Sequence, residues 1–297
     1  MNPSISNQNA LTLVNPQNGN LAFKVFAFSN NNHFDHLQRN NFYSLIWVNQ
    51  GEGKLKADFS EYVFAKDTLF AFSPYQPFML VTDHDLSGTA IFFHPDFFCI
   101  HKHHEEVACN GVLFNNIYEP PFTEIDDASA GTFRMIIDQM ISEMQKPALA
   151  QYELLISYLK IFLITASRVK ARNLTPIQNA DSHRKEPFIL QNLKNSIEEH
   201  FKTKHSASDY ADMLNISTKA LSKITKVHFN KTLTDLISER IIIEAKRELY
   251  LTHKPVKEIA YELGYDDEYY FSRFFKTNTD ISPQTYREVV GFGHGDN

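Results

Sequence analysis

The feature that most constrains this chain is a short segment that occurs twice near its C-terminal end. Residues 211–226 read ADMLNISTKALSKITK, and residues 260–276 read AYELGYDDEYYFSRFFK. An alanine begins each copy and a leucine follows three residues later. After one extra residue in the second copy, a serine followed by a cation falls in the same register. Each copy predicts a short helix, a tight turn and a second helix.

The turn residues of both copies support this interpretation. A tight turn between helices needs a residue that tolerates unusual backbone dihedrals, and Asn215 and Gly264 supply one in each copy. Ser217 can cap the second helix of the first copy by accepting a hydrogen bond from a free backbone amide. In the second copy either Asp266 or Asp267 can do the same.

The second helix of each copy has an inward apolar face and an outward polar face. Leu221 and Ile224 face inward in the first copy, and Phe271 and Phe274 do so in the second. An outward face of cations and short polar side chains can enter the major groove of DNA, where Arg or Lys pairs with guanine and Ser or Thr reaches base edges or phosphates. A plain surface of a helical bundle is the alternative, and the matched register of two copies favours DNA. The outward residues are Lys219, Ser222, Lys223 and Lys226, then Tyr269, Ser272, Arg273 and Lys276.

A longer helix is predicted between the two copies. Its apolar stripe consists of Leu236, Ile237, Ile241, Ala245 and Leu249. Such a helix would hold the copies at a fixed separation. Two recognition helices about 34–36 Å apart would enter successive major grooves on one face of the DNA.

Residues 187–290 resemble the AraC/XylS family of bacterial transcription regulators. The resemblance implies a seven-helix DNA-binding domain with two helix-turn-helix motifs, in which Thr218, Lys219, Ser222, Lys223, Glu268, Tyr269, Ser272 and Arg273 read the groove. It is carried by Arg240, Ala245, Leu249, Ile259, Ala260, Gly264, Tyr265, the run Tyr270 to Lys276, Ser282, Pro283, Tyr286 and Arg287.

The chain departs from the family pattern at four positions. Asn230 and Asp280 stand where the family usually has glycine, and both residue types tolerate the left-handed conformation. Thr225 replaces a usual aromatic residue, which would loosen the packing of the first motif. Glu268 is acidic at a groove-facing position, where it would either accept a hydrogen bond from a cytosine amine or repel phosphate.

The front half predicts a β-rich domain followed by helices. Short apolar runs recur at roughly ten-residue spacing between turn residues, which is typical of a sandwich or barrel. Two helices follow, one from about Ala128 to Pro147 and one from Gln151 to Lys170. The expected strands are Phe42–Val48, Lys54–Phe59, Tyr62–Phe64, Thr68–Phe72, Phe78–Thr82 and Thr89–Phe93.

This layout is similar to the cupin-like sensor domain and dimerisation helices that often precede such a DNA-binding module, and Lys66–Pro74 is similar to a strand and turn of those barrels. The expected fold is therefore an α+β multidomain protein. It consists of a cupin-like β-barrel sensor domain (1–127), a helical dimerisation region (128–172), a linker (173–186) and an all-α DNA-binding domain (187–291).

Composition excludes several classes of protein. The net charge of −6 combines an acidic front with a mildly basic back, and that basic excess is too weak to indicate DNA binding by itself. No apolar run is long enough to cross a membrane, and residues 1–20 do not read as a secretion signal. Cys99 and Cys109 are expected to be free thiols in a reducing cytoplasm.

The front half contains two other candidate sites. His101, His103 and His104, followed by Glu105 and Glu106, suggest a metal site, but they come after the expected strands and fit a solvated loop better. No metal or cofactor is therefore expected. A ligand cavity could be lined by aromatic side chains, although aromatics on strands are more often core. Those candidates are Tyr43, Trp47, Phe70, Phe72 and Phe92.

The sequence thus predicts a cytoplasmic, sequence-specific and ligand-responsive DNA-binding regulator rather than an enzyme. Its expected partners are double-stranded DNA, a small-molecule effector and a second copy of itself. The family analogy adds RNA polymerase and activation of transcription. The alternative is a metal-dependent cupin-type enzyme with a helical assembly domain.

Overall fold

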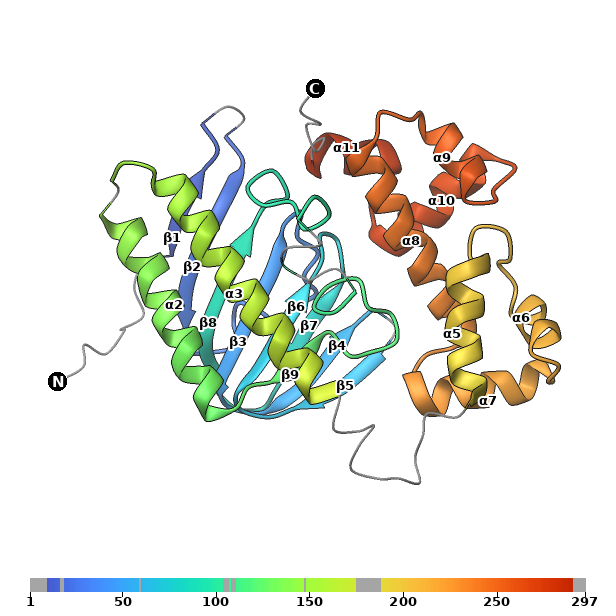
Figure 1. Cartoon of the computed structure of the whole chain (residues 1–297), viewed down its shortest axis with the longest axis horizontal. Helices are drawn as coiled ribbons and strands as arrows, with labels where there is room; N and C mark the ends of the chain where they lie inside the picture. Colours follow the sequence, from blue (N-terminus) through green and yellow to red (C-terminus); the bar gives the residue numbers. More distant parts are fainter. Residues whose placement is uncertain are drawn as a thin grey trace. The chain divides into compact units, whose positions relative to one another are not determined.

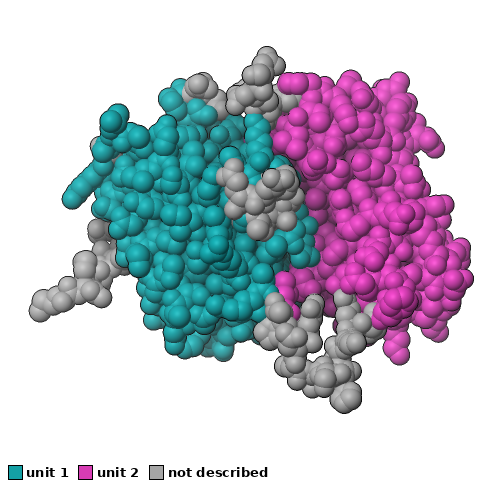
Figure 2. All heavy atoms as spheres, in the orientation of Figure 1, with its two compact units in different colours: residues 1–116, 120–173 teal, residues 117–119, 174–297 magenta. Residues whose placement is uncertain are grey.

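We describe the protein from a computed structural model, which places residues 10–16, 19–58, 60–103, 107, 111–146, 148–174 and 188–290. The chain divides into two compact units (Figure 2). The front unit comprises residues 1–116 and 120–173. The back unit comprises residues 117–119 and 174–297.

The described strands of the front unit form two antiparallel sheets (Figure 1). The larger sheet has the order β1-β2-β8-β3-β6-β9, and the smaller has the order β5-β4-β7. The strands are β1 (Leu11–Val14), β2 (Leu21–Phe28), β3 (Tyr43–Gln50), β4 (Gly53–Ala57), β5 (Ser60–Phe64), β6 (Thr68–Phe72), β7 (Phe78–Val81), β8 (Ser87–Phe93) and β9 (Phe122–Glu124).

The larger sheet is buried on both faces. Because successive side chains of a strand point to opposite faces, Leu45 of β3 packs toward the helices and Ile46 packs toward the smaller sheet. The expectation of a β-rich domain is confirmed. The expected strand Lys54–Phe59 ends at Ala57, because Asp58 turns the chain with a φ of 51°. Phe59 lies outside the described residues.

Two helices cover one face of the larger sheet, α2 (Asp127–Gln145) and α3 (Gln151–Leu174). Asp126 caps α2, since its carboxylate accepts a hydrogen bond from the amide of Ser129 at 2.8 Å. Both helices were predicted, and α3 runs four residues past the expected Lys170. Pro147 and most of the expected linker 173–186 lie outside the described part of the chain.

Between residues 188 and 290 the back unit consists of helices joined by short connections. The central helix, α8, packs against α5, α7, α9 and α11. The apolar stripe predicted for α8 is fully buried. No helix within the described ranges is long and apolar enough to cross a membrane. The helices are α5 (Phe188–His200), α6 (Ala207–Met213), α7 (Thr218–Phe229), α8 (Leu233–Leu251), α9 (Val256–Glu262), α10 (Glu268–Thr279) and α11 (Pro283–Val290).

Candidate nucleic-acid interface

Helices α6 and α7 form the first helix-turn-helix. Ser206 and Asp209 make a reciprocal capping box at the start of α6. Asn215 occupies the turn with a φ of 53°, as the sequence predicted. Ser217 then caps α7 by accepting a hydrogen bond from the amide of Ala220 at 3.2 Å. The local sequence therefore starts α7, the first recognition helix, at a defined residue.

Helices α9 and α10 form the second helix-turn-helix in the same way. Gly264 occupies the turn with a φ of 80°, and a Cβ atom there would lie 2.1 Å from the carbonyl oxygen of Lys202. Only glycine fits such a position. Asp267 caps α10, because one carboxylate oxygen accepts from the amides of Tyr269 and Tyr270 at 2.6 and 3.0 Å. The cap is thus Asp267 and not Asp266.

Each recognition helix ends on a residue in the left-handed conformation. The φ angles are 56° at Asn230 after α7 and 69° at Asp280 after α10. These are the two positions where the family usually has glycine. The prediction that asparagine and aspartate can take its place is confirmed.

The inward face of α7 has a polar side chain at one position where α10 has an aromatic one. Leu221 and Phe271 are both fully buried, as expected. Phe275 of α10 packs its ring against Phe271. The corresponding Thr225 of α7 is also fully buried, and its hydroxyl donates to a backbone carbonyl of its own helix at 3.1 Å. The smaller side chain gives α7 less apolar contact with its neighbours than α10 has.

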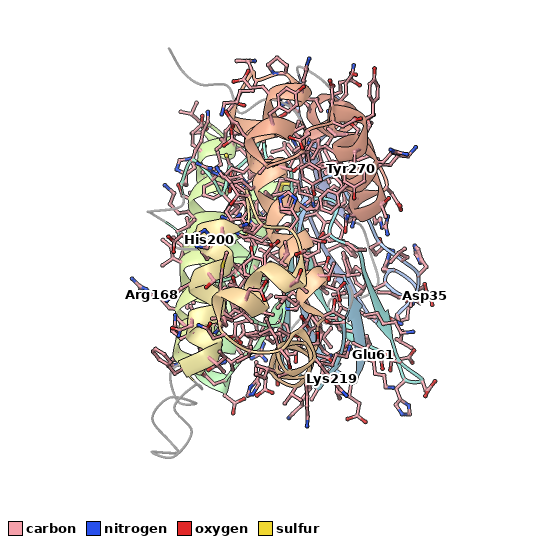
Figure 3. The ribbon with its side chains drawn as sticks, turned by 90° about the vertical axis from the view of Figure 1, so that its right-hand side faces the viewer. Asp35, Glu61, Arg168, His200, Lys219 and Tyr270 are labelled. Carbon is pink, nitrogen blue, oxygen red and sulfur yellow. The ribbon has the colours of Figure 1, made fainter. Side chains whose placement is uncertain are left out.

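The proposed groove-reading side chains lie on the free faces of the two helices. Glu268 and Ser272 are half-buried, whereas the side chain of Tyr269 is 80% exposed. Figure 3 shows Lys219 of α7 and Tyr270 of α10 toward opposite ends of the back unit. The exposed positions are Thr218, Lys219, Ser222, Lys223, Lys226, Tyr269, Arg273 and Lys276.

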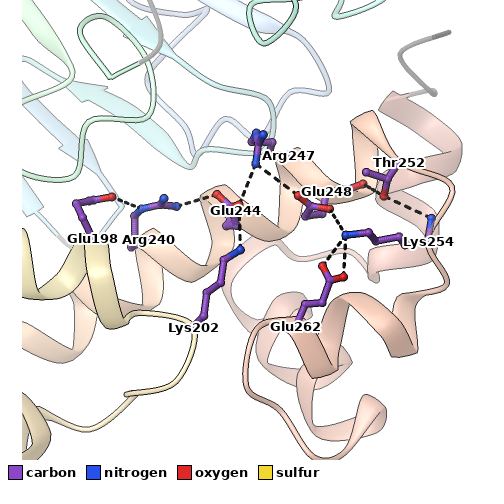
Figure 4. Close-up of polar contacts among 9 residues, drawn as sticks. All are labelled: Glu198, Lys202, Arg240, Glu244, Arg247, Glu248, Thr252, Lys254 and Glu262. Carbon is purple, nitrogen blue, oxygen red and sulfur yellow. Dashed lines mark hydrogen bonds and ion pairs between the residues drawn. The ribbon is translucent and has the colours of Figure 1, made fainter.

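A buried carboxylate on α8 joins the elements around the first helix-turn-helix (Figure 4). Glu244 is only 7% exposed, and it pairs with Arg240 at 3.2 Å, Arg247 at 3.0 Å and Lys202 at 3.7 Å. Burial alone would raise the pKa of Glu244. The neighbouring guanidinium groups of Arg240 and Arg247 outweigh it and hold that pKa below its usual value. Arg240 also binds Glu198 of α5 at 2.8 Å.

A second cluster ties α8 to the second helix-turn-helix. The ammonium of Lys254 pairs with Glu248 of α8 at 3.1 Å and with Glu262 of α9 at 2.7 Å (Figure 4). Sequence reasoning missed both clusters. Part of the signal was present, because Arg240 and Glu244 are four residues apart and Arg247 follows Glu244 by three.

The aromatic residues expected to line a ligand pocket do not come together. Tyr43 and Trp47 lie on the helix-covered face of the larger sheet. Phe70, Phe72 and Phe92 lie on its other face, between the two sheets. All five are buried, and no single cavity can be lined by residues on both faces of one sheet.

The histidine cluster is only partly described. The ring of His103 stacks on Phe98 at 4.9 Å between centroids. His104, Glu105 and Glu106 lie outside the described residues, as does Cys109, while the side chain of Cys99 is buried. Within the part of the chain that the structure describes, no group of three metal-binding side chains comes together.

Comparison with known proteins identifies the helical back unit. A helix-turn-helix domain family matches residues 210–288. The regulatory protein SoxS of Escherichia coli (strain K12) is 33% identical over 106 residues, which are 36% of this chain and 96% of SoxS. The HTH-type transcriptional activator Btr of Bacillus subtilis (strain 168) is 34% identical over 111 residues, 36% of this chain.

The match to longer proteins is partial. The chain spans only 21% of the length of Btr. Among solved structures, a ToxT variant from Vibrio cholerae (strain SCE256) is 16% identical with a TM-score of 0.41, covering 92% of this chain and 99% of that one.

Proposed function

Because the chain belongs to the AraC/XylS family, a family of transcription regulators and not of enzymes, we propose that it binds a specific double-stranded DNA sequence with α7 and α10. The observation that carries this proposal is the matched construction of the two recognition helices. Each has a side-chain cap, a left-handed residue at its end and a free polar face. Helix α8 packs against the elements of both motifs.

The chemistry of the free faces suits the major groove. The guanidinium of Arg273 can pair with O6 and N7 of guanine, and Lys223 can do so at the equivalent position of α7. Ser222 and Ser272 can reach base edges or phosphates. The proposed DNA-contacting set is Thr218, Lys219, Ser222, Lys223, Lys226, Glu268, Tyr269, Ser272, Arg273 and Lys276.

Selection from random duplex DNA tests the proposal. The full chain should enrich a motif with two half-sites about one helical turn apart, about 34–36 Å. A Lys223→Ala/Arg273→Ala variant should lose the motif while keeping its fold, because both side chains are exposed. Enrichment of no sequence by the wild-type chain, with and without effector candidates, would refute it.

We further propose that α2 and α3 mediate a homodimer. The packed helices leave apolar side chains exposed, namely Met135 at 63% and Ile161 at 49%. Light scattering at micromolar concentration should give a molar mass twice that of a single chain. The Ile161→Glu variant should give the mass of a single chain. A monomeric wild-type chain would contradict this.

The front unit is proposed to bind a small apolar effector. The apolar core between the two sheets is the proposed location, because Phe70, Phe72 and Phe92 lie in it. An effector that binds only the folded state raises the melting temperature of the full chain. Trp47 and Tyr43 face the helices, so replacing them should not alter the response directly.

Activation of transcription is proposed because Btr is named a transcriptional activator. Such a role would require contact with RNA polymerase, and a DNA-binding regulator of this family would act in the bacterial cytoplasm. Transcription from a selected operator with purified polymerase should rise when the full chain is added. A fall would identify a repressor.

A further inference from the structure

The two recognition helices carry unequal charge. Helix α7 presents Lys219, Lys223 and Lys226 and has no acidic residue between Thr218 and Phe229. In α10 the exposed cations, Arg273 and Lys276, lie beyond the first turn. Cations that neutralise phosphates supply the sequence-independent, salt-dependent part of DNA affinity. That part is therefore concentrated on α7.

The start of α10 is acidic and its backbone amides are already used. Asp266, Asp267 and Glu268 follow one another where the helix begins. The carboxylate of Asp267 occupies the amides of Tyr269 and Tyr270. A DNA phosphate would meet like charge here, so this end of α10 opposes contact with the DNA backbone.

What α10 offers beside these carboxylates is aromatic surface. Tyr269 is 80% exposed and Tyr270 is 59% exposed. Helix α7 contains no tyrosine or tryptophan, and its phenylalanine, Phe229, is only 7% exposed. A tyrosine ring can pack on a thymine methyl group, and a carboxylate can accept from the cytosine amine, so both depend on which base is present.

We propose that the two motifs contribute unequally to recognition: beside its base contact at Lys223, α7 supplies most of the charge-based affinity, and α10 supplies most of the discrimination between DNA sequences. Glu268 and Asp266 act as specificity determinants by disfavouring unrelated DNA, while Tyr269 makes the favourable base contact. This inference rests on the proposed DNA-binding function and adds an unequal role for each helix.

The test measures the affinity of the full chain for its selected operator and for an unrelated duplex between 50 and 300 mM KCl. Each lysine that contacts a phosphate contributes about 0.9 to the slope of log affinity against log salt. Lys219→Ala/Lys226→Ala should therefore reduce the slope by about 1.8 and weaken both duplexes alike. Glu268→Gln should tighten the unrelated duplex roughly two- to fivefold and lower the specificity ratio.

Two further variants complete the design. Tyr269→Ala should weaken the operator about tenfold, with the salt slope unchanged. Glu199→Gln on α5 makes the same charge change away from both recognition helices and should alter neither duplex. The proposal is overturned if Glu268→Gln leaves the unrelated duplex unchanged, or if Tyr269→Ala weakens both duplexes equally. A wild-type chain that prefers no duplex at all would instead refute the proposed function.

Discussion

Replacing Gly264 by alanine should destabilise the back unit strongly. An L-residue at a φ of 80° costs about 1–2 kcal/mol. The new Cβ atom would also lie 2.1 Å from the carbonyl oxygen of Lys202, a backbone atom that cannot rotate away. Forced overpacking of this kind costs about 1–3 kcal/mol, so the expected total is about 2–5 kcal/mol. That is a large fraction of the 5–15 kcal/mol typical of a folded domain.

Peptide-resolved hydrogen exchange on the full chain measures this loss in each unit separately. A loss of 2 kcal/mol accelerates exchange through global opening about thirtyfold, and this should appear in α8 but not in β3. Gly131 provides the matched control. It lies inside α2, and a Cβ atom added there would have no neighbouring atom within 4 Å, so Gly131→Ala should stabilise the front unit by about 0.5–1 kcal/mol.

If Gly264→Ala changed the protection of α8 by less than a factor of two, the contact with Lys202 would not constrain the turn. Asn215→Gly tests the same position of the first motif. Its φ of 53° suits glycine, so a change of no more than about 0.5 kcal/mol is expected.

Three further predictions concern the back unit. Arg273→Ala should cost about 1–3 kcal/mol of operator affinity and relax specificity at one base pair, checked with single-base operator variants; an equal loss on every sequence would indicate a phosphate contact. Glu244→Gln should destabilise the back unit by about 1–3 kcal/mol in urea titrations, because the buried carboxylate that pairs with Arg240 and Arg247 loses its charge, whereas Glu199→Gln should change little. Burial lowers the pKa of His205 below its ordinary 6.5, so the unfolded chain binds a proton that the native chain does not. Stability should therefore fall as the pH drops below 6.5, and His205→Gln should remove that dependence.

Local features of the motifs could be predicted from the sequence. Left-handed backbone conformations could be predicted at Asn215, Asn230 and Asp280, because few residue types other than glycine, asparagine and aspartate adopt them. The cap at Ser217 depends on residues within four positions of it. For such features the chemistry lies in one short window of sequence, so no knowledge of the tertiary fold is needed.

Other features depend on contacts that the sequence does not display. Both faces of the larger sheet are apolar. The hydrophobic pattern of the strands around Tyr43 and Phe72 therefore does not indicate which face packs against the helices. The ion cluster around Glu244 gathers Lys202 from a segment far away in the chain. Strands β1, β2 and β9 were not among the expected strands; β1 has four residues and β9 has three, which give too short an alternation to recognise.

The continuous helix α8 has a consequence for how such a protein can change over evolution. Each residue inserted into an α-helix turns everything after it by about 100° and moves it by about 1.5 Å. In the proposed mode of DNA binding, one insertion within Leu233–Leu251 would therefore rotate α10 away from the major groove next to the one that α7 enters. Substitutions on the free faces can alter which bases are preferred, whereas the distance between half-sites is inherited unchanged. The operators bound by descendants of this chain should therefore differ in base sequence but keep the same distance between half-sites.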